Sequence, residues 1–234
     1  MLRTIAVIGA KGFVGSAICE EIEKRKEFKL IRICRGDDIA LLVREAEVVI
    51  HAANSSKRFF AEKNPEIDFF ESVEKTFKIK QLARGKKLIL VSSISARVQL
   101  NAAYGRHRRA CELIVDEGQS LIIRLGPMFG ESKEVGALND ILNNRPCYVT
   151  EKTRYAYVNV AYTAKKIIDL VDHIGVIELG AKNAIELGEL KKILGSGSTF
   201  SGSDDTQIPL QPQSDAPDAR EILNFALNLR KVVR

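Results

Sequence analysis

The sequence has few of the residues from which disulfide frameworks and metal centres are built. Its 234 residues include 4 cysteines, 3 histidines and no tryptophan. Because Cys19, Cys34, Cys111 and Cys147 form no C-x-x-C pair and the histidines are isolated, the sequence indicates neither a disulfide framework nor a metal site. Scattered cysteines of this kind are typical of a reducing compartment, so we expect a cytoplasmic protein.

Long hydrophobic runs are also missing. No stretch approaches the roughly 20 apolar residues that a membrane span needs, so we expect no membrane association. The apolar run at residues 4–8 is short and leads into a glycine turn, so residues 1–15 are not expected to be a targeting segment. The net charge of +6 is not accompanied by interleaved aromatic residues or a recognition motif, and we expect no nucleic-acid partner.

A glycine turn follows the first apolar run. Gly9, Gly12 and Gly15 have the spacing G-x-x-G-x-x-G, and the apolar residues after them recur with helical spacing. A strand, a glycine turn and a helix start in this order are typical of a Rossmann-type dinucleotide site. There, Gly9 permits the tight turn, Gly12 lets the backbone approach a pyrophosphate, and Gly15 lets the helix pack on the strand. The phosphates lie at the helix N-terminus, where unpaired N–H groups favour negative charge.

We therefore expect a set of dinucleotide contacts in this turn, while a turn that only packs is the alternative. The set comprises Gly9, Lys11, Gly12, Phe13, Val14 and Gly15.

Strand and helix patterns alternate along the first half of the chain. Strands are predicted at residues 29–34, 48–51, 87–92 and 121–125, and helices at residues 38–46, 65–83 and 104–117. Between the second and third strands only a short helix fits. The alternation predicts an α/β fold, a doubly wound parallel sheet of the Rossmann type.

The pattern loosens after residue 126. Residues 195–217 are rich in Gly, Ser, Asp and Pro and are predicted to be a long loop, and Pro217 suits the start of a final helix with an apolar face. We expect a dinucleotide-binding domain over residues 1–171, with part of 126–150 contributing to the substrate site. Residues 172–234 would then form a small C-terminal substrate lobe.

Several short motifs follow one another in a characteristic order. They are the glycine turn, His51-Ala52-Ala53, a helix over 65–76, Val91-Ser92-Ser93, Tyr104-x-x-x-Arg108, the segment 124–130 (Arg-Leu-Gly-Pro-Met-Phe-Gly) and the segment 157–161 (Tyr-Val-Asn-Val-Ala). In this order and separation, residues 4–171 resemble the extended short-chain dehydrogenase/reductases, the nucleotide-sugar epimerase and dehydratase group with its smaller atypical relatives.

The resemblance implies that Ser93 and Tyr104 carry out the chemistry, with Ser92 and Ser95 as alternative hydroxyls. Hydride transfer at a sugar carbon must be matched by proton transfer at its oxygen, and a phenol hydrogen-bonded to that oxygen can give or take the proton. Arg108 lies one helical turn after Tyr104 on the same face, where its charge favours negative charge on the phenol oxygen.

Two features of the sequence differ from patterns of the resembling family. Arg108 stands where the family has lysine, and its planar fork need not reproduce the contacts of lysine to the nicotinamide ribose. A coenzyme-binding protein without turnover, acting as a sensor or assembly subunit, therefore stays open. The acidic pair that marks family dehydratases is replaced by Ile94 and Ser95, so we expect a reductase or an epimerase instead.

The end of the second strand indicates the coenzyme. An acidic residue there would bind the ribose 2′-hydroxyl, whereas a basic one would accommodate a 2′-phosphate. Arg35 and Lys11 favour NADP, and NAD stays open because Asp37 or Asp38 could take the ribose role. The resemblance adds coenzyme contacts at Ala52, Ala53, Leu125, Gly126, Pro127 and Met128.

Taken together, the sequence predicts an NAD(P)-dependent reductase or epimerase. Its substrate would be a small molecule, a nucleotide-linked sugar or a similar hydroxyl or carbonyl compound. A homodimer is one assembly that the sequence leaves open.

Overall fold

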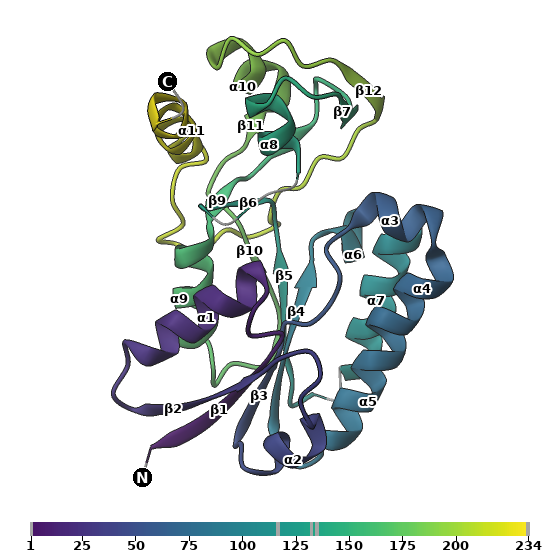
Figure 1. Cartoon of the computed structure of the whole chain (residues 1–234), viewed down its shortest axis with the longest axis vertical. Coiled ribbons are helices and arrows are strands. Elements are labelled where there is room, and N and C mark those ends of the chain that lie inside the picture. Colours follow the sequence, from purple (N-terminus) through teal and green to yellow (C-terminus); the bar gives the residue numbers. More distant parts are fainter. Residues whose placement is uncertain (1, 116–117, 132, 134–135, 233–234) are drawn as a thin grey trace. The chain divides into compact units, whose positions relative to one another are not determined.

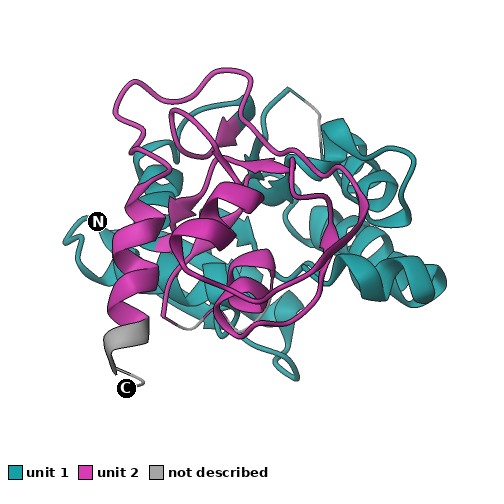
Figure 2. Ribbon diagram, turned by 90° about the horizontal axis from the view of Figure 1, so that it is seen from above, with its two compact units in different colours: residues 1–125, 161–177 teal, residues 126–160, 178–234 magenta. Residues whose placement is uncertain are grey.

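The computed structural model describes residues 2–115, 118–131, 133 and 136–232. The chain divides into two compact units, coloured separately in Figure 2. Unit 1 comprises residues 1–125 and 161–177, and unit 2 comprises residues 126–160 and 178–234.

Unit 1 is built on a six-stranded sheet. Its strands are β1 (Arg3–Ile8), β2 (Phe28–Ile33), β3 (Val48–His51), β4 (Lys87–Ser93), β5 (Leu121–Leu125) and β10 (Gly175–Leu179). Their order is β10-β5-β4-β3-β1-β2, and the first five strands pair in parallel. β1 lies between β2 and β3, so the strand order reverses there. The predicted doubly wound α/β fold is confirmed.

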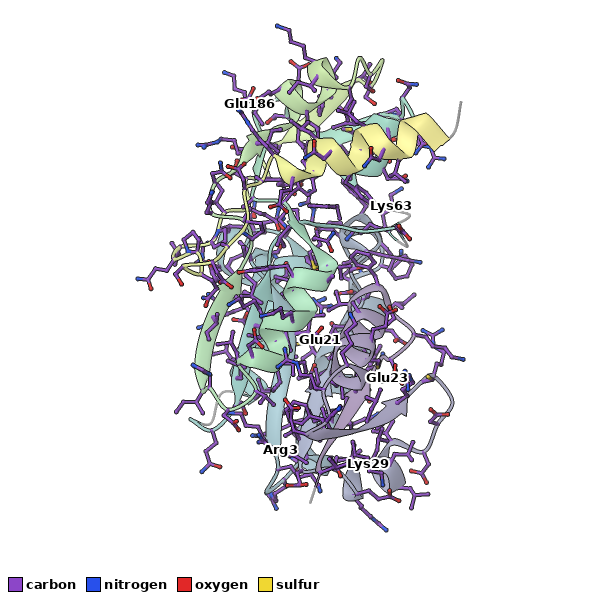
Figure 3. The ribbon with its side chains drawn as sticks, turned by 90° about the vertical axis from the view of Figure 1, so that its left-hand side faces the viewer. Arg3, Glu21, Glu23, Lys29, Lys63 and Glu186 are labelled. Atoms are coloured by element: carbon purple, nitrogen blue, oxygen red, sulfur yellow. The ribbon has the colours of Figure 1, made fainter. Side chains whose placement is uncertain are left out.

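Helices cover both faces of this sheet (Figure 1). One face carries α1 (Phe13–Glu23) and α9 (Val160–Asp169). Arg25, just after α1, joins the two helices because it bonds to Glu21 at 2.8 Å and to Asp169 at 2.6 Å. Glu21 is labelled in Figure 3.

The other face carries α4, α5 and α7 (Figure 1). The remaining helical elements of unit 1 are α2 (Ile39–Arg44), α3 (Arg58–Lys63), α4 (Pro65–Phe69), η1 (Phe70–Glu74), α5 (Lys75–Leu82), α6 (Ser95–Val98) and α7 (Ala103–Val115). The helix predicted over 65–83 is interrupted by η1, a π-helical segment. Within η1 the Ser72 hydroxyl donates to the backbone carbonyl of Asp68, a local bond that competes with the regular helical pattern.

The connection between β2 and β3 is as short as predicted. It contains the single helix α2, whose first turn is capped by Asp38 through a 3.0 Å bond from the Leu41 N–H. The helix predicted over 104–117 begins at Ala103, and its last two positions lie outside the described residues.

The described residues of unit 2 form three small two-stranded sheets and three helices. Strands β6 (Met128–Phe129) and β9 (Val158–Asn159) pair, as do β7 (Cys147–Val149) and β12 (Phe200–Ser203), and β8 (Arg154–Tyr155) and β11 (Ile185–Glu186). The helices are α8 (Ala137–Leu142), α10 (Leu187–Ile193) and α11 (Glu221–Val232). Their apolar core includes Phe129, Ile141, Tyr157, Leu190 and Ile222.

Two predictions for unit 2 were wrong in detail. The predicted loop 195–217 contains β12, which the sequence does not reveal because its Phe-Ser-Gly-Ser segment is mostly exposed and its pairing comes from β7. The final helix begins at Glu221 and not at Pro217. Asp218 accepts the Arg220 N–H at 2.9 Å and a 3.1 Å bond from Asn183, which holds this stretch as a turn.

In the part of the chain that the structure describes, no helix is long and apolar enough to cross a membrane. Among the same residues, no group of three or more His, Cys, Asp or Glu side chains could hold a metal ion.

Candidate functional site

The glycine turn connects β1 to α1 at the point where the strand order reverses. The N–H of Gly9 donates to the carbonyl of Ile33 at the end of β2, at 2.9 Å, and the N–H of Gly12 donates back to the Gly9 carbonyl at 2.9 Å. Gly12 is the N-cap of α1, and the first turn of this helix contains no acidic residue. The positive end of the helix dipole is therefore not compensated by a side chain of that turn.

Packing accounts for two of the three glycines. Gly9 has a φ of +90°, and a Cβ there would lie 2.9 Å from the backbone of Ala52 and Ala53. A Cβ at Gly15 would lie 2.1 Å from the Gly9 carbonyl oxygen. At Gly12 the only contact within 4 Å would be that same oxygen, at 3.2 Å, and the residue is exposed. Gly12 is therefore the glycine that protein packing requires least.

The acidic and basic residues after β2 differ in their hydrogen-bond partners. Asp37 accepts the backbone N–H of Cys34 at 2.7 Å, and Asp38 caps α2. Arg35 is exposed. Its charge reaches the Glu71 carboxyl, whose pKa is lowered by the hydrogen bond and charge of Lys75 and also by Arg35. Both acidic residues are thus engaged by backbone N–H groups, while the basic residue faces solvent.

His51 closes β3 and is fully buried. Its Nδ1 accepts the Ala53 N–H at 3.4 Å, so Nε2 carries the proton and donates to the Thr76 hydroxyl at 3.1 Å. Burial, followed by the charges of Arg108 and Lys75, lowers the pKa of this imidazole to about 3. His51 is therefore a neutral packing residue that fixes the turn after β3.

Three serines stand near the end of β4, and each has a different environment. Ser92 is buried and donates to the Glu112 carboxylate at 2.6 Å. Ser93 is half-buried, and its hydroxyl oxygen accepts the Ser95 N–H at 3.2 Å. Ser95 begins α6 and is buried. Because accepting one bond leaves the O–H of Ser93 able to donate, Ser93 keeps a hydrogen-bonding capacity that Ser92 has already used.

Helix α7 brings Tyr104 and Arg108 together. The Arg108 guanidinium carbon lies 5.0 Å from the centroid of the Tyr104 ring, and its Nη2 donates to the Ser55 carbonyl at 3.0 Å. Both side chains are buried, and Arg108 is 2% exposed. The Tyr104 N–H donates to the Glu62 carboxylate of α3 at 3.2 Å. The predicted neighbourhood of the two side chains is present, but the cation lies over the ring.

A buried carboxylate further along α7 holds the helix on the sheet. Glu112 is fully buried and receives two bonds from Arg124 of β5, at 2.9 and 2.7 Å, and one from Arg109 at 3.1 Å. Together with Ser92, these residues form a network across α7, β4 and β5. A two-pronged arginine–carboxylate pair is both strong and geometrically specific, so the network fixes the position of α7 and of Tyr104 on it.

The segment after β5 leaves unit 1. Leu125 is buried in unit 1, and its carbonyl accepts the Ile94 N–H at 3.0 Å. Gly126, Pro127 and Met128 belong to unit 2. The Pro127 carbonyl accepts the Val158 N–H at 3.1 Å, and Met128 pairs with Val158 in the β6–β9 sheet.

The structure thus brings the glycine turn together with Ala52 and Ala53, and Tyr104 together with Arg108. Sequence reasoning missed Asn54 and Glu112. Glu112 had a detectable signal, because a charged residue falls within the buried stripe of α7. Asn54 had none, because a polar residue in a loop is ordinary.

No family model matches this sequence, and no curated protein matches it either. Solved structures do match. The dTDP-4-dehydrorhamnose reductase of Bacillus anthracis, in complex with NADP, superposes with a TM-score of 0.78 at 16% identity, over 98% of this chain and 100% of that one. The chain shares the fold of that reductase.

Two other solved structures have the same fold. An NAD-dependent NDP-hexosamine 5,6-dehydratase, TunA, matches with a TM-score of 0.82 at 13% identity over 98% of both chains. The UDP-glucose 4-epimerase of Thermotoga maritima, solved with UDP-glucose, matches with a TM-score of 0.74 at 15% identity, over 99% of this chain and 100% of that one. The predicted Rossmann-type architecture is therefore found in known reductases, dehydratases and epimerases.

Proposed function

We propose that this chain is an NAD(P)-dependent reductase or epimerase that acts on a nucleotide-linked sugar. The observation that carries the proposal is the glycine turn. It lies at the reversal point of the strand order, where open α/β sheets bind ligands, and the exposed Gly12 is the glycine of this turn that packing requires least. A diphosphate approaching the start of α1 would account for a glycine at this position.

The surrounding residues fit a nicotinamide coenzyme. The turn from Gly9 to Gly15 would hold the pyrophosphate. Ala52 and Ala53, whose backbone borders Gly9, have small side chains that would leave room for the coenzyme. By resemblance, Leu125 and the backbone of Gly126 to Met128 would border the nicotinamide. When bound, the coenzyme supplies or accepts the hydride.

NADP is the coenzyme that the charges favour. Asp37 and Asp38 already bind backbone N–H groups, whereas Arg35 and Lys11 are exposed cations beside the turn. A 2′-phosphate would meet positive charge at Arg35, whereas Asp37 and Asp38 each already use one carboxylate oxygen for a backbone N–H.

Tyr104 is the proposed proton donor and acceptor for the substrate oxygen, and Ser93 the proposed second hydrogen-bond donor to it. Arg108 would act through its contact with the Tyr104 ring, which orders the ring and adds positive charge near it. We assign the binding of the sugar nucleotide to unit 2, which contains most of the predicted C-terminal lobe (172–234) and the segment 126–150 that was predicted to contribute to the substrate site. The solved relatives that carry UDP-glucose or act on dTDP- and NDP-linked sugars support this substrate class.

Titration calorimetry with NADPH and NADH tests the coenzyme step. We expect binding of both, with NADPH tighter. Nicotinamide redox activity on a panel of nucleotide sugars and 4-keto sugars tests the reaction, and Tyr104→Phe should reduce turnover by about 10²–10⁴-fold with coenzyme affinity unchanged. If neither NADPH nor NADH bound, the proposal would be refuted.

A coenzyme-binding protein without turnover is the second candidate. One observation favours it: the Arg108 guanidinium lies over the Tyr104 ring and bonds to Ser55, in a position where the resembling family has lysine. Equal, low turnover in the wild type and in Tyr104→Phe, with normal NADPH binding, would select this candidate.

We also propose a homodimer through the outer face of α4, η1, α5 and α7. Large apolar side chains of these helices are exposed, namely Ile67, Phe69, Phe70, Phe77 and Leu113. Their burial by a second copy would remove apolar surface from water. Light scattering should give twice the chain mass of 26.0 kDa, and Phe70→Glu should restore the monomer.

The four free cysteines suit the proposed cytoplasmic location.

A further inference from the structure

A carboxylate from a distant part of the chain meets the start of α7. The backbone N–H of Tyr104 donates to Oε1 of Glu62, in the short helix α3, at 3.2 Å. Glu62 is exposed, and among the described residues this is the one hydrogen bond that its carboxylate makes. Its second oxygen, Oε2, is therefore open to a ligand.

The segment that carries Glu62 is fastened to unit 1 at further points. Ala61 is fully buried and seats α3, and the Arg108 guanidinium binds the carbonyl of Ser55, ahead of this helix, at 3.0 Å. Because α3 follows β3, it lies at the carboxyl edge of the sheet, where open α/β sheets bind ligands (Figure 1). Glu62 is thus a held carboxylate beside the proposed proton donor, Tyr104.

The other carboxylate near this part of α7 is already used. Glu112 is buried, and both of its oxygens accept bonds from Arg124 and Arg109 and from the Ser92 hydroxyl. An acid or base for the substrate needs an oxygen that the substrate can reach. Glu62 meets this condition, and Glu112 does not.

We propose that Glu62 is a further catalytic residue, the general base that removes a proton from the sugar carbon next to a keto group. This inference rests on the proposed function and extends it to epimerisation at that carbon. Hydrogen bonding to the keto oxygen makes such a proton easier to remove, because negative charge develops on this oxygen. The Tyr104 phenol supplies the hydrogen bond, and the Glu62 carboxylate accepts the proton.

The step is balanced without an oxidant or a reductant. Oε2 of Glu62 takes the proton, and the electron pair of the broken carbon–hydrogen bond forms a carbon–carbon double bond. One pair of the carbonyl double bond moves to the oxygen, to which the Tyr104 phenol donates. Return of the proton from Glu62 restores the original ketone, and delivery of a proton from water to the opposite face gives the epimer.

A purely structural role would give Glu62 one task. The first turn of α7 contains no acidic residue, and Glu62 would then only accept an N–H group at the start of this helix. Glu62→Gln separates the two roles, because the amide oxygen still accepts the Tyr104 N–H but the amide is not a base for a carbon-bound proton.

Exchange of deuterium from solvent tests the step with the full chain. Nucleotide-linked 4-keto sugars are incubated in D2O with NADP+, so that reduction cannot remove the ketone, and NMR follows deuterium at the carbons beside the keto group. We expect at least one of them to exchange faster than without protein. Glu62→Gln should slow this exchange about 10²–10⁴-fold, while the Kd for NADPH stays within about twofold.

Glu66→Gln, the same change at an exposed position of α4, is the matched control and should leave exchange and NADPH binding unchanged. Thermal unfolding checks that both variants are folded. Exchange that persists in folded Glu62→Gln would overturn the catalytic role of Glu62, and so would slower exchange with equally weakened NADPH binding.

The wild type separates this inference from the proposed function. A chain that binds NADPH but exchanges none of the 4-keto sugars would overturn the role of Glu62 and leave the coenzyme site in place. A chain that binds neither coenzyme would overturn the proposed function and this inference with it.

Discussion

Two regions of unit 1 carry the candidate site, and they are built in different ways. The glycine edge, defined as residues 9–15 with Ala52 and Ala53, is made of backbone atoms held at close distance. The tyrosine edge, defined as Ser92, Ser93, Tyr104, Arg108 and Glu112, is made of side chains that bond to one another and to β5.

The difference shows what each region tolerates. At Gly9 and Gly15 of the glycine edge an added methyl group meets backbone, so these two positions do not accept a larger residue. At the tyrosine edge, side chains hold one another in place: Arg108 is positioned by its bond to Ser55 and its contact with Tyr104. The first region is set by backbone packing, and the second by contacts between side chains.

The largest effect on stability is expected for a substitution that removes contacts at the tyrosine edge. Glu112→Ala removes the buried carboxylate that Arg124, Arg109 and Ser92 contact. Removing one partner of a buried ion pair costs about 3–5 kcal/mol of unfolding free energy, which urea denaturation measures. Glu20→Ala, on the exposed side of α1, is the control and should cost less than about 0.5 kcal/mol. A loss below about 1 kcal/mol for Glu112→Ala would mean that the network does not hold α7.

The next effect separates packing from binding at the glycine edge. Gly15→Ala places a Cβ 2.1 Å from the Gly9 oxygen and should destabilise the fold by about 3 kcal/mol. Gly12→Ala meets that oxygen at 3.2 Å and should cost about 1 kcal/mol or less, while NADPH affinity falls about tenfold or more. Equal loss of stability in both variants would assign Gly12 to packing and remove the main support for the coenzyme site.

His51 lies between the two edges and gives a pH dependence. Its pKa is about 3 in the folded chain, where Arg108 contributes to the lowering, against 6.5 when exposed. As pH falls from 7 to 5, the unfolded chain binds a proton at this position and the folded chain does not, so stability is lost. The wild type should therefore lose about 2 kcal/mol more than His51→Asn over this interval, measured by urea denaturation at both pH values. Parallel losses in the two proteins would contradict a neutral, buried His51.

The smallest effect tests the coenzyme preference at the glycine edge. Arg35→Ala removes an exposed cation, so stability should change by less than about 0.5 kcal/mol. The Kd for NADPH should rise about tenfold, and the Kd for NADH should stay within about twofold. Arg32→Ala, at a half-exposed position that pairs with Glu23 at 2.7 Å, controls for the general loss of positive charge. Equal weakening of both coenzymes would argue against a 2′-phosphate site.

The sequence by itself determined the glycine edge and the parallel sheet around it. The reason is that both depend on neighbours in the chain: an apolar run followed by glycines and a helical pattern fixes a strand, a turn and a helix locally. The adjacency of Tyr104 and Arg108 was predictable for the same reason, since four residues along a helix return to the same face.

Only the tertiary structure decided the partners of these side chains. Glu112 meets Arg124 across 12 residues, Arg108 meets Ser55 across 53, and β12 forms only because β7 lies beside it. Such contacts depend on how distant segments pack, which no local pattern encodes. The same holds for Asn54, which is an unremarkable loop residue in the sequence and a buried amide without a partner in the folded chain that the structure describes.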